Sequence, residues 1–230
     1  MYDQRLKENL PGVEERMAAA MARSGRSGVV RLVAVTKGHP AEAVVAAAGA
    51  GLADIGENRV QELDEKRTAL PDLDVRWHLI GHLQRNKVRR AVALFDWLHA
   101  VDSLRLAQEL SKEAQRSGST VRALVQVNVS GEATKGGFDA DREIAAIGEV
   151  AQLPALSCEG LMTMAPLTED QAAIRSTFVR TRRLLERCVT EGVPLQGREL
   201  SMGMSNDYEI AIEEGSTMIR LGTVLFGERL

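Results

Sequence analysis

Aromatic residues and cysteines are both scarce in this sequence, and each shortage excludes a class of protein. Phe, Trp and Tyr together make up 3% of the 230 residues, too few for the stacking platforms that bind single-stranded nucleic acid. The two cysteines, Cys158 and Cys188, lie in separate segments and form no CxxC pair. Neither a disulfide framework nor a zinc site can therefore be built from them.

A strong net charge and long hydrophobic runs are also absent. The formal charge is −3 at pH 7, whereas general nucleic-acid binders are usually basic overall. The most apolar stretch, residues 41–53, is rich in Ala and Gly and is too short to span a bilayer. The first residues lack the apolar segment of a secretory signal. We therefore expect a cytoplasmic protein that binds neither nucleic acid nor membranes.

Short β-branched apolar runs alternate with longer segments of helical periodicity along the chain. The expected strands are residues 29–35, 52–55, 77–80, 97–101, 121–129, 156–164, 199–204 and 217–221. The expected helices are residues 40–50, 58–69, 84–95, 103–116, 139–152, 168–191 and 206–214. An apolar stripe over residues 6–21 predicts a further helix before the first strand, with a kink or a break at Pro11.

Eight strands that alternate with helices over about 200 residues predict an α/β protein, a single (β/α)8 TIM barrel domain over residues 1–230. An open doubly wound sheet is the alternative, but no GxGxxG motif follows the first expected strand. The active sites of such barrels lie at the C-terminal ends of the strands. The residues that follow each strand are therefore the candidate site residues.

The first expected strand leads into Lys37. In a barrel mouth, desolvation disfavours the charged form of an amine. The neutral amine is a nucleophile that forms Schiff bases with carbonyl compounds. The alternative is a lysine whose stem lies along the apolar surface while its ammonium group reaches solvent.

The loops after the seventh and eighth strands indicate a phosphate site, because TIM barrels commonly bind phosphate there. Ser201, Ser205 and Thr223 supply hydroxyl donors, and Thr223 begins an expected short helical turn. Gly222 has no side chain, so an anion can approach its backbone N–H closely. The alternative is ordinary turn and capping chemistry, in which Asn206 or Ser205 caps the next helix.

The first and eighth strands are neighbours when a barrel closes, which places Lys37 and the Gly222 loop on the same side of the mouth. A ligand that carries both an aldehyde and a phosphate would bridge them, and pyridoxal 5′-phosphate (PLP) carries both. Arg220 lies in the eighth strand, where it could donate to the pyridine nitrogen. A cation there disfavours protonation of that nitrogen and weakens the ring as an electron sink. The alternative is an ion pair between Arg220 and Glu57 or Asp207.

Other polar residues near strand ends carry weaker signals. Asn58 and His78 could contact a ligand or satisfy the backbone. His78 and His82 are four residues apart, but they lie in an expected strand and loop rather than in a helix, so we expect no metal site. The basic residues between 85 and 90 indicate a solvated face or a weak attraction for an anion or a partner.

Several segments, in order over nearly the whole chain, match one known family. They are residues 34–40 (AVTKGHP), 56–62 (GENRVQE), 77–87 (WHLIGHLQRNK), 161–164 (LMTM), 200–207 (LSMGMSND), 215–223 (GSTMIRLGT) and 226–227 (FG). The chain resembles the YggS/PROSC-type pyridoxal phosphate homeostasis family. The resemblance implies a fold type III PLP-binding barrel, similar to the N-terminal domain of bacterial alanine racemase, with an extra N-terminal helix.

The resemblance also implies PLP bound as a Schiff base on Lys37, with phosphate contacts from the last two loops and Arg220 near the ring nitrogen. The residues expected around the cofactor are Lys37, Asn58, His78, Ser201, Ser205, Arg220, Gly222 and Thr223.

Members of this family are regarded as proteins that bind PLP and buffer or deliver it, without a robust catalytic reaction. The resemblance therefore implies a regulator or carrier with no catalytic residue, and PLP-dependent apoenzymes as its partners. A low-activity PLP-dependent amino-acid racemase, a class I aldolase-like barrel and a structural adaptor are the alternatives. We expect a monomer or a weak dimer.

Overall fold

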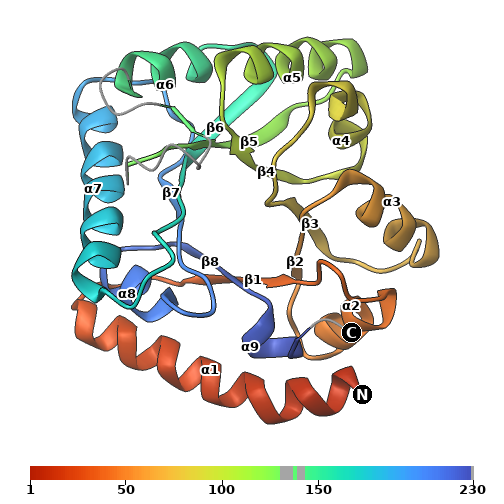
Figure 1. Cartoon of the computed structure of the whole chain (residues 1–230). Coiled ribbons are helices and arrows are strands. Elements are labelled where there is room, and N and C mark those ends of the chain that lie inside the picture. The colour runs from red at the N-terminus through yellow and green to blue at the C-terminus, as the bar shows by residue number, and fades with distance from the viewer. Residues whose placement is uncertain (130–136, 139–142, 229–230) are drawn as a thin grey trace.

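The computed structural model describes residues 1–129, 137–138 and 143–228. In this part of the chain, eight parallel strands form a closed barrel in sequence order (Figure 1). β8 pairs with β1, which excludes the open doubly wound sheet. The strands are β1 (Arg31–Val35), β2 (Asp54–Glu57), β3 (Arg76–Leu79), β4 (Trp97–Val101), β5 (Val121–Gln126), β6 (Leu156–Met162), β7 (Glu199–Ser201) and β8 (Met218–Leu221).

Helices surround the barrel as an outer ring, with α1 running along its outside beside α2, α8 and α9 (Figure 1). They are α1 (Tyr2–Ser24), α2 (Ala41–Gly49), α3 (Val60–Ala69), α4 (Val88–Leu94), α5 (Leu104–Ser117), α6 (Glu143–Ala151), α7 (Gln171–Thr190), α8 (Tyr208–Glu213) and α9 (Thr223–Phe226). A short 3-10 helix, η1 (Arg85–Lys87), leads into α4. No helix in the described ranges is both long and apolar enough to cross a lipid bilayer.

Helix α5 shows how local sequence sets an element of this ring. The Ser103 side chain caps its first turn by accepting a hydrogen bond from the Leu106 N–H. Leu106 and Leu110 are buried at helical spacing, so one face of α5 packs on the strands. Gly118 ends the helix in the left-handed conformation.

The prediction for Pro11 was a kink or a break, and the break was wrong. Helix α1 continues through Pro11 from Tyr2 to Ser24. Pro11 itself is exposed, whereas Leu10 and Val13 on either side of it are buried. The missing backbone hydrogen bond therefore lies on the solvent side of the helix. Packing of the buried face holds both halves in line.

Strands β5 and β7 each end three residues earlier than their apolar patterns predict. β5 ends at Gln126 rather than residue 129, and beyond it Val127 forms only an isolated bridge with Phe138. β7 ends at Ser201 rather than residue 204. In both cases the chain stays buried after it leaves the sheet, so burial extends the apolar pattern past the strand. Other predicted element ends differ by up to four residues, and residues 139–142 of one predicted helix lie outside the described residues.

The space enclosed by the strands is filled by side chains. A cluster that includes Trp97, Leu124, Met162 and Met218 joins four strands. β4 and β8 are not neighbours in the sheet, so this cluster extends across the barrel interior. The Arg31 guanidinium also lies over the Trp97 ring, 5.3 Å from its centre. The barrel interior is a packed core in which charged groups are included.

Candidate functional site

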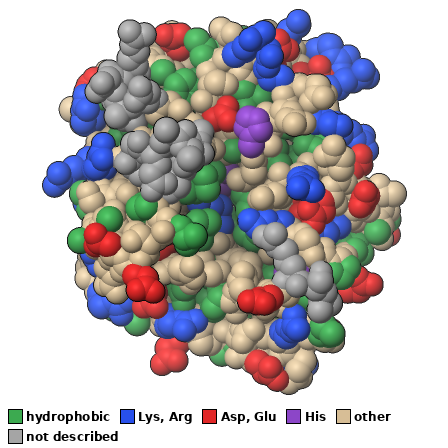
Figure 2. All heavy atoms as spheres, viewed as in Figure 1, with side chains coloured by type: hydrophobic (Ala, Val, Ile, Leu, Met, Phe, Trp, Pro, Cys, Tyr) green, Lys and Arg blue, Asp and Glu red, His purple; other side chains and the backbone are tan. Residues whose placement is uncertain are grey.

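A hollow lies over the centre of the strand ring in the space-filling view, with basic and hydrophobic side chains visible at its floor (Figure 2). Two of the predicted site segments meet beside the β1–β8 seam. Gly222 follows β8, and a Cβ atom built on it would lie 3.2 Å from the Val35 carbonyl oxygen. A side chain at this position would be crowded, and the contact brings the loop after β8 next to the end of β1. Lys37 follows Val35 by two residues, so the predicted neighbourhood of Lys37 and Gly222 is present.

Lys37 lies in the turn after β1 and is half-buried. Residues of a strand alternate between the two faces of its sheet. Val33 and Val35 therefore share the inward face with Arg31, whose guanidinium lies over the Trp97 ring inside the barrel. Lys37 follows in the turn at this strand end, at the mouth of the barrel.

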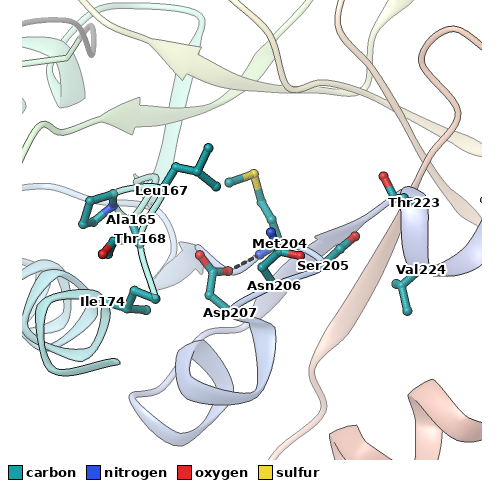
Figure 3. A pocket seen from close by; sticks show the side chains of 11 residues that line it. Ala165, Leu167, Thr168, Ile174, Met204, Ser205, Asn206, Asp207, Thr223 and Val224 are labelled. Carbon is teal, nitrogen blue, oxygen red and sulfur yellow. Dashed lines mark hydrogen bonds between the residues drawn. The ribbon is translucent and has the colours of Figure 1, made fainter. Parts of the chain in front are cut away.

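A cavity of about 550 Å³ lies between the loop after β6, the loop after β7 and the start of α9. Ser205 and Thr223 line it from two different loops (Figure 3). Neither hydroxyl has a hydrogen-bond partner among the described residues. Asp207, not Ser205, occupies the N-cap position of α8, and its Oδ1 accepts a hydrogen bond from the Met204 N–H at 2.6 Å. The alternative in which Ser205 caps α8 is therefore wrong.

Arg220 is buried in β8, and its guanidinium bonds neutral oxygens. Its Nη1 donates to the Ser201 Oγ at 2.6 Å, and its Nη2 donates to the Thr163 carbonyl at 3.0 Å. No carboxylate of the described ranges lies within ion-pair distance of it, so the predicted alternative pairs with Glu57 or Asp207 are absent. Burial lowers the pKa of Arg220 to about 10, although the nearby charge of Asp207 opposes the change. Arg220 is thus a buried cation whose charge is not neutralised by a direct partner.

A chain of hydrogen bonds runs from Arg220 through the barrel interior. The Ser201 Oγ lies 2.8 Å from the His99 Nδ1, and the His99 Nε2 lies 2.8 Å from the His78 Nδ1. The His78 Nε2 lies 2.8 Å from the Asp54 Oδ1, at the start of β2. Arg76 donates two further bonds to Asp54, at 2.7 and 2.6 Å.

The donors and acceptors of this chain follow from its two ends. Burial opposes ionisation of Asp54, but the bonds from Arg76 and His78 hold its pKa below the ordinary range, so it is a carboxylate that only accepts. Burial lowers the pKa of both His78 and His99, so both rings are neutral and each donates through Nε2. Ser201 then donates to the His99 Nδ1, and its oxygen accepts from Arg220. Every bond of the chain has one consistent direction.

The structure brings some predicted residues together and separates others. Lys37, Gly222, Ser205 and Thr223 lie on loops at the β1, β7 and β8 ends. Ser201 lies inside the barrel, where it is part of the hydrogen-bond chain, and it does not line the cavity.

His78 and Asn58 also occupy different surroundings. Both ring nitrogens of His78 are used inside the barrel. Asn58 is half-buried in the wall of a second cavity of about 650 Å³, which Arg59, His82 and Lys87 also line.

Tyr208 points away from the strand ends. It is the first residue of α8, and its hydroxyl oxygen accepts a hydrogen bond from the Arg16 Nε of α1 at 2.7 Å. His39 is buried and lies 3.2 Å from the Tyr2 hydroxyl through its Nδ1. In the described part of the chain, no group of three or more His, Cys, Asp or Glu side chains is arranged to hold a metal ion.

Sequence reasoning missed Asp54 and His99. Both are ionisable residues in strands whose every residue is buried. A polar residue within a fully apolar run is the signal that marks them, because a buried polar group needs a partner. The identity of the partner depends on barrel closure, which no local pattern contains.

Comparison with known proteins gives the family of this chain. Residues 9–230 match the family described as "Alanine racemase, N-terminal domain". The pyridoxal phosphate homeostasis protein of Pseudomonas aeruginosa is 43% identical over 226 residues, which cover 97% of this chain and 96% of that protein. This chain belongs to the pyridoxal phosphate homeostasis family. The Escherichia coli family member is 37% identical over 233 residues, with 97% of both chains covered.

Solved structures place the family fold in a wider group. PipY of Synechococcus elongatus, solved with PLP bound, has 41% sequence identity and a TM-score of 0.83, over 93% of this chain and 99% of that chain. An alanine racemase of Clostridium difficile has 16% identity and a TM-score of 0.74, over 96% of this chain and 57% of that chain. The second similarity shows the barrel fold alone.

Proposed function

We propose that residues 1–230 form a single PLP-binding domain that holds PLP as a Schiff base on Lys37 and serves in intracellular PLP homeostasis. It buffers the cofactor or delivers it to PLP-dependent apoenzymes. The observation that carries this proposal is Arg220, a buried cation with no direct carboxylate partner in the described ranges. It lies in the strand that pairs with β1, which leads into Lys37.

The residues present fit this cofactor. PLP supplies an aldehyde, and its carbon forms a C=N bond with the Lys37 amine nitrogen with release of one water molecule. Ser205 and Thr223 offer hydroxyl donors to the phosphate, and Gly222 leaves its backbone open to it. Arg220 offers further N–H donors to the pyridine nitrogen, because its two bonds use only part of the guanidinium.

The hydrogen-bond chain inside the barrel favours a carrier function over a racemase activity. Arg220 is fixed beside the expected ring position by Ser201 and Thr163, and a cation there keeps the pyridine nitrogen unprotonated. An unprotonated ring is a poor electron sink, which weakens removal of an α-proton from an amino acid. Tyr208, whose hydroxyl is bonded to Arg16, is directed to α1 and offers no acid or base to the mouth. We therefore assign no catalytic residue.

Three predicted cofactor residues have indirect or peripheral places in this proposal. Ser201 supports Arg220 instead of contacting the phosphate. His78 acts through His99 and Ser201, since both of its nitrogens are bonded inside the barrel. Asn58 stands at the second cavity, at the edge of the expected cofactor position.

The test is the absorbance spectrum of the purified protein with added PLP, measured for wild type, Lys37→Ala and Lys87→Ala. Wild type and Lys87→Ala are expected to show a visible Schiff-base band, and Lys37→Ala is expected to show none. Borohydride reduction followed by peptide mapping should place the reduced adduct on Lys37. A wild-type protein without the band, or an adduct on another lysine, contradicts the proposal.

The alternative of a low-activity amino-acid racemase is tested separately. The α-proton of alanine is expected to exchange with deuterium no faster in the presence of the protein than with free PLP. Faster exchange, abolished by Lys37→Ala, would show that the protein is an enzyme.

A further inference from the structure

A buried group of charges lies behind the turn that carries Lys37. It consists of Glu57 at the end of β2 and of Glu62 and Lys66 in α3, and we call these three residues the α3 clamp. The Lys66 Nζ lies 2.6 Å from the Glu57 Oε1 and 3.3 Å from the Glu62 Oε1. Glu57 is fully buried and Lys66 is 5% exposed. Glu57 and Lys66 therefore belong to the core between the barrel and its helices, and Glu62 lies at the edge of this core.

The α3 clamp bonds the residues on both sides of Lys37. Before it, the Thr36 carbonyl accepts from the Lys66 Nζ at 2.7 Å, and the Thr36 hydroxyl donates to the Glu57 Oε1 at 2.5 Å. After it, the Gly38 N–H donates to the Glu62 Oε1. Gly38 has a φ of 73°, a left-handed conformation that a larger residue adopts only with strain. The turn that carries Lys37 is thus tied to α3 at its two ends.

Stability alone is a weak reason for these charges to be buried. A buried ion pair is often no more stabilising than apolar side chains of the same volume. The second carboxylate oxygen of Glu57, Oε2, has no hydrogen-bond partner among the described residues, which adds to the cost. Burial also raises the pKa of Glu57, against the charge of Lys66. Burial of the charges of the α3 clamp costs free energy, and the clamp bonds one particular turn. Its role is therefore better explained by the turn that it holds in place.

We infer that the α3 clamp positions Lys37 for reaction with the cofactor aldehyde. The inference rests on the proposed function and extends it from the lysine to three positioning residues on β2 and α3. The loops after β7 and β8 fix the phosphate end of the cofactor, so the distance to the aldehyde is set by where the β1 turn holds Lys37. A displacement of about 1 Å between reacting groups can cost about 100-fold in rate.

Glu62→Ala is the most direct test, because the Glu62 side chain is 24% exposed and the fold does not depend on it as on Glu57. Loss of its bond to Gly38 is expected to slow the appearance of the visible Schiff-base band, after mixing with PLP, by about 10-fold or more. Glu62→Gln keeps an oxygen that accepts the Gly38 N–H, so it should react at close to the wild-type rate. Glu65→Ala, which removes an exposed carboxylate from the same helix, is the matched control.

Thr36→Val is a second, independent variant. It removes the hydroxyl that donates to Glu57 but keeps the shape of a fully buried side chain. It should also slow band formation. The thermal midpoint and the total PLP bound in equilibrium dialysis are measured for every variant, because the phosphate contacts do not involve the α3 clamp and initial binding should persist.

Each outcome separates the two proposals. If wild type forms no Schiff-base band through Lys37, the proposed function fails, and the positioning role of the α3 clamp fails with it. If wild type forms the band and both Glu62→Ala and Thr36→Val react at the wild-type rate, only the clamp is overturned. It is also overturned if Glu62→Gln is as slow as Glu62→Ala, or if every loss of rate is matched by an equal loss of folded protein. A slow band with retained folding and retained PLP binding supports it.

Discussion

Each nitrogen of His78 and His99 has one role in the hydrogen-bond chain that ends at Arg220. The chain works only if Ser201 donates to His99 and accepts from Arg220, so its hydroxyl is the single link between the histidines and the guanidinium. The same hydroxyl is needed twice, and no other described side chain can replace it at this position.

Ser201→Ala should therefore lower the free energy of unfolding by about 1–3 kcal/mol, because it leaves the His99 Nδ1 and one Arg220 N–H buried without a partner. Urea denaturation measures the change. Ser119→Ala, at an exposed serine, is the control and should stay within about 0.5 kcal/mol of wild type. Equal effects of the two substitutions would show that the Ser201 link does not contribute to stability.

The placement of single residues could be predicted where it follows from strand order alone. Lys37 and Gly222 were expected to be neighbours because they follow the first and last strands of a closed barrel, and they are. Lys66 was not expected at the site, since its bond to Thr36 depends on how α3 packs over β1 and β2. Helix packing of this kind is decided by the whole core rather than by spacing along the chain.

Helix α1 shows tertiary packing overriding a local signal. Its buried face continues on both sides of Pro11, and the helix forms in spite of the Pro. The carbonyl of Lys7, four residues earlier, still lacks the backbone donor that any other residue would supply. The helix thus carries a cost of about 3 kcal/mol that packing offsets.

Pro11→Ala should raise the free energy of unfolding by about 2 kcal/mol, the helix gain less the greater freedom of the unfolded chain. Because Pro11 is exposed, the substitution leaves the core unchanged. Glu14→Ala, at another exposed position of α1, provides the comparison and should have a much smaller effect. A destabilised Pro11→Ala protein would mean that the ring itself makes a needed contact.

Element types were predicted more closely than element ends, for a physical reason. Alternating apolar and polar patterns report burial, and burial marks strands well when the next residues are exposed. After Gln126 and after Ser201 the chain remains buried as it turns, so the pattern extends beyond the sheet. The loop after β7, which carries Ser205, follows a strand end that was wrong, whereas β1 and β8, which lead into Lys37 and Gly222, end where predicted.

At the scale of the whole molecule, closure of the barrel assembles the candidate site and also lowers stability at acidic pH. It brings β1 beside β8 and so joins the Lys37 turn to the expected phosphate loops. It also encloses His78 and His99 at 0% exposure, and each is kept neutral because burial lowers its pKa. The fold therefore has two histidines that take up protons more readily when the chain unfolds.

This difference gives the stability a dependence on pH with a definite sign. Below about pH 6.5, the ordinary pKa of histidine, the unfolded chain binds protons at His78 and His99 that the folded chain does not bind. The free energy of unfolding should therefore fall as the pH falls from about 7 to 5, by up to about 1.4 kcal/mol per pH unit for each histidine. Asp54, whose pKa is lowered, loses its contribution only at more acidic pH, and Glu57, whose pKa is raised, acts in the opposite direction.

A comparison of variants isolates the histidines from the carboxyl groups. Urea denaturation of His99→Asn across this pH range should show a shallower slope than wild type, by about 1.4 kcal/mol per pH unit at most, because one of the two rings whose pKa burial lowers is gone. Ser119→Ala, which removes no titratable group, should keep the wild-type slope. If His99→Asn keeps the full wild-type slope, His99 is protonated in the folded protein. The directed chain from Asp54 to Arg220 would then have to be reversed between His99 and Ser201, with the ring donating to the hydroxyl.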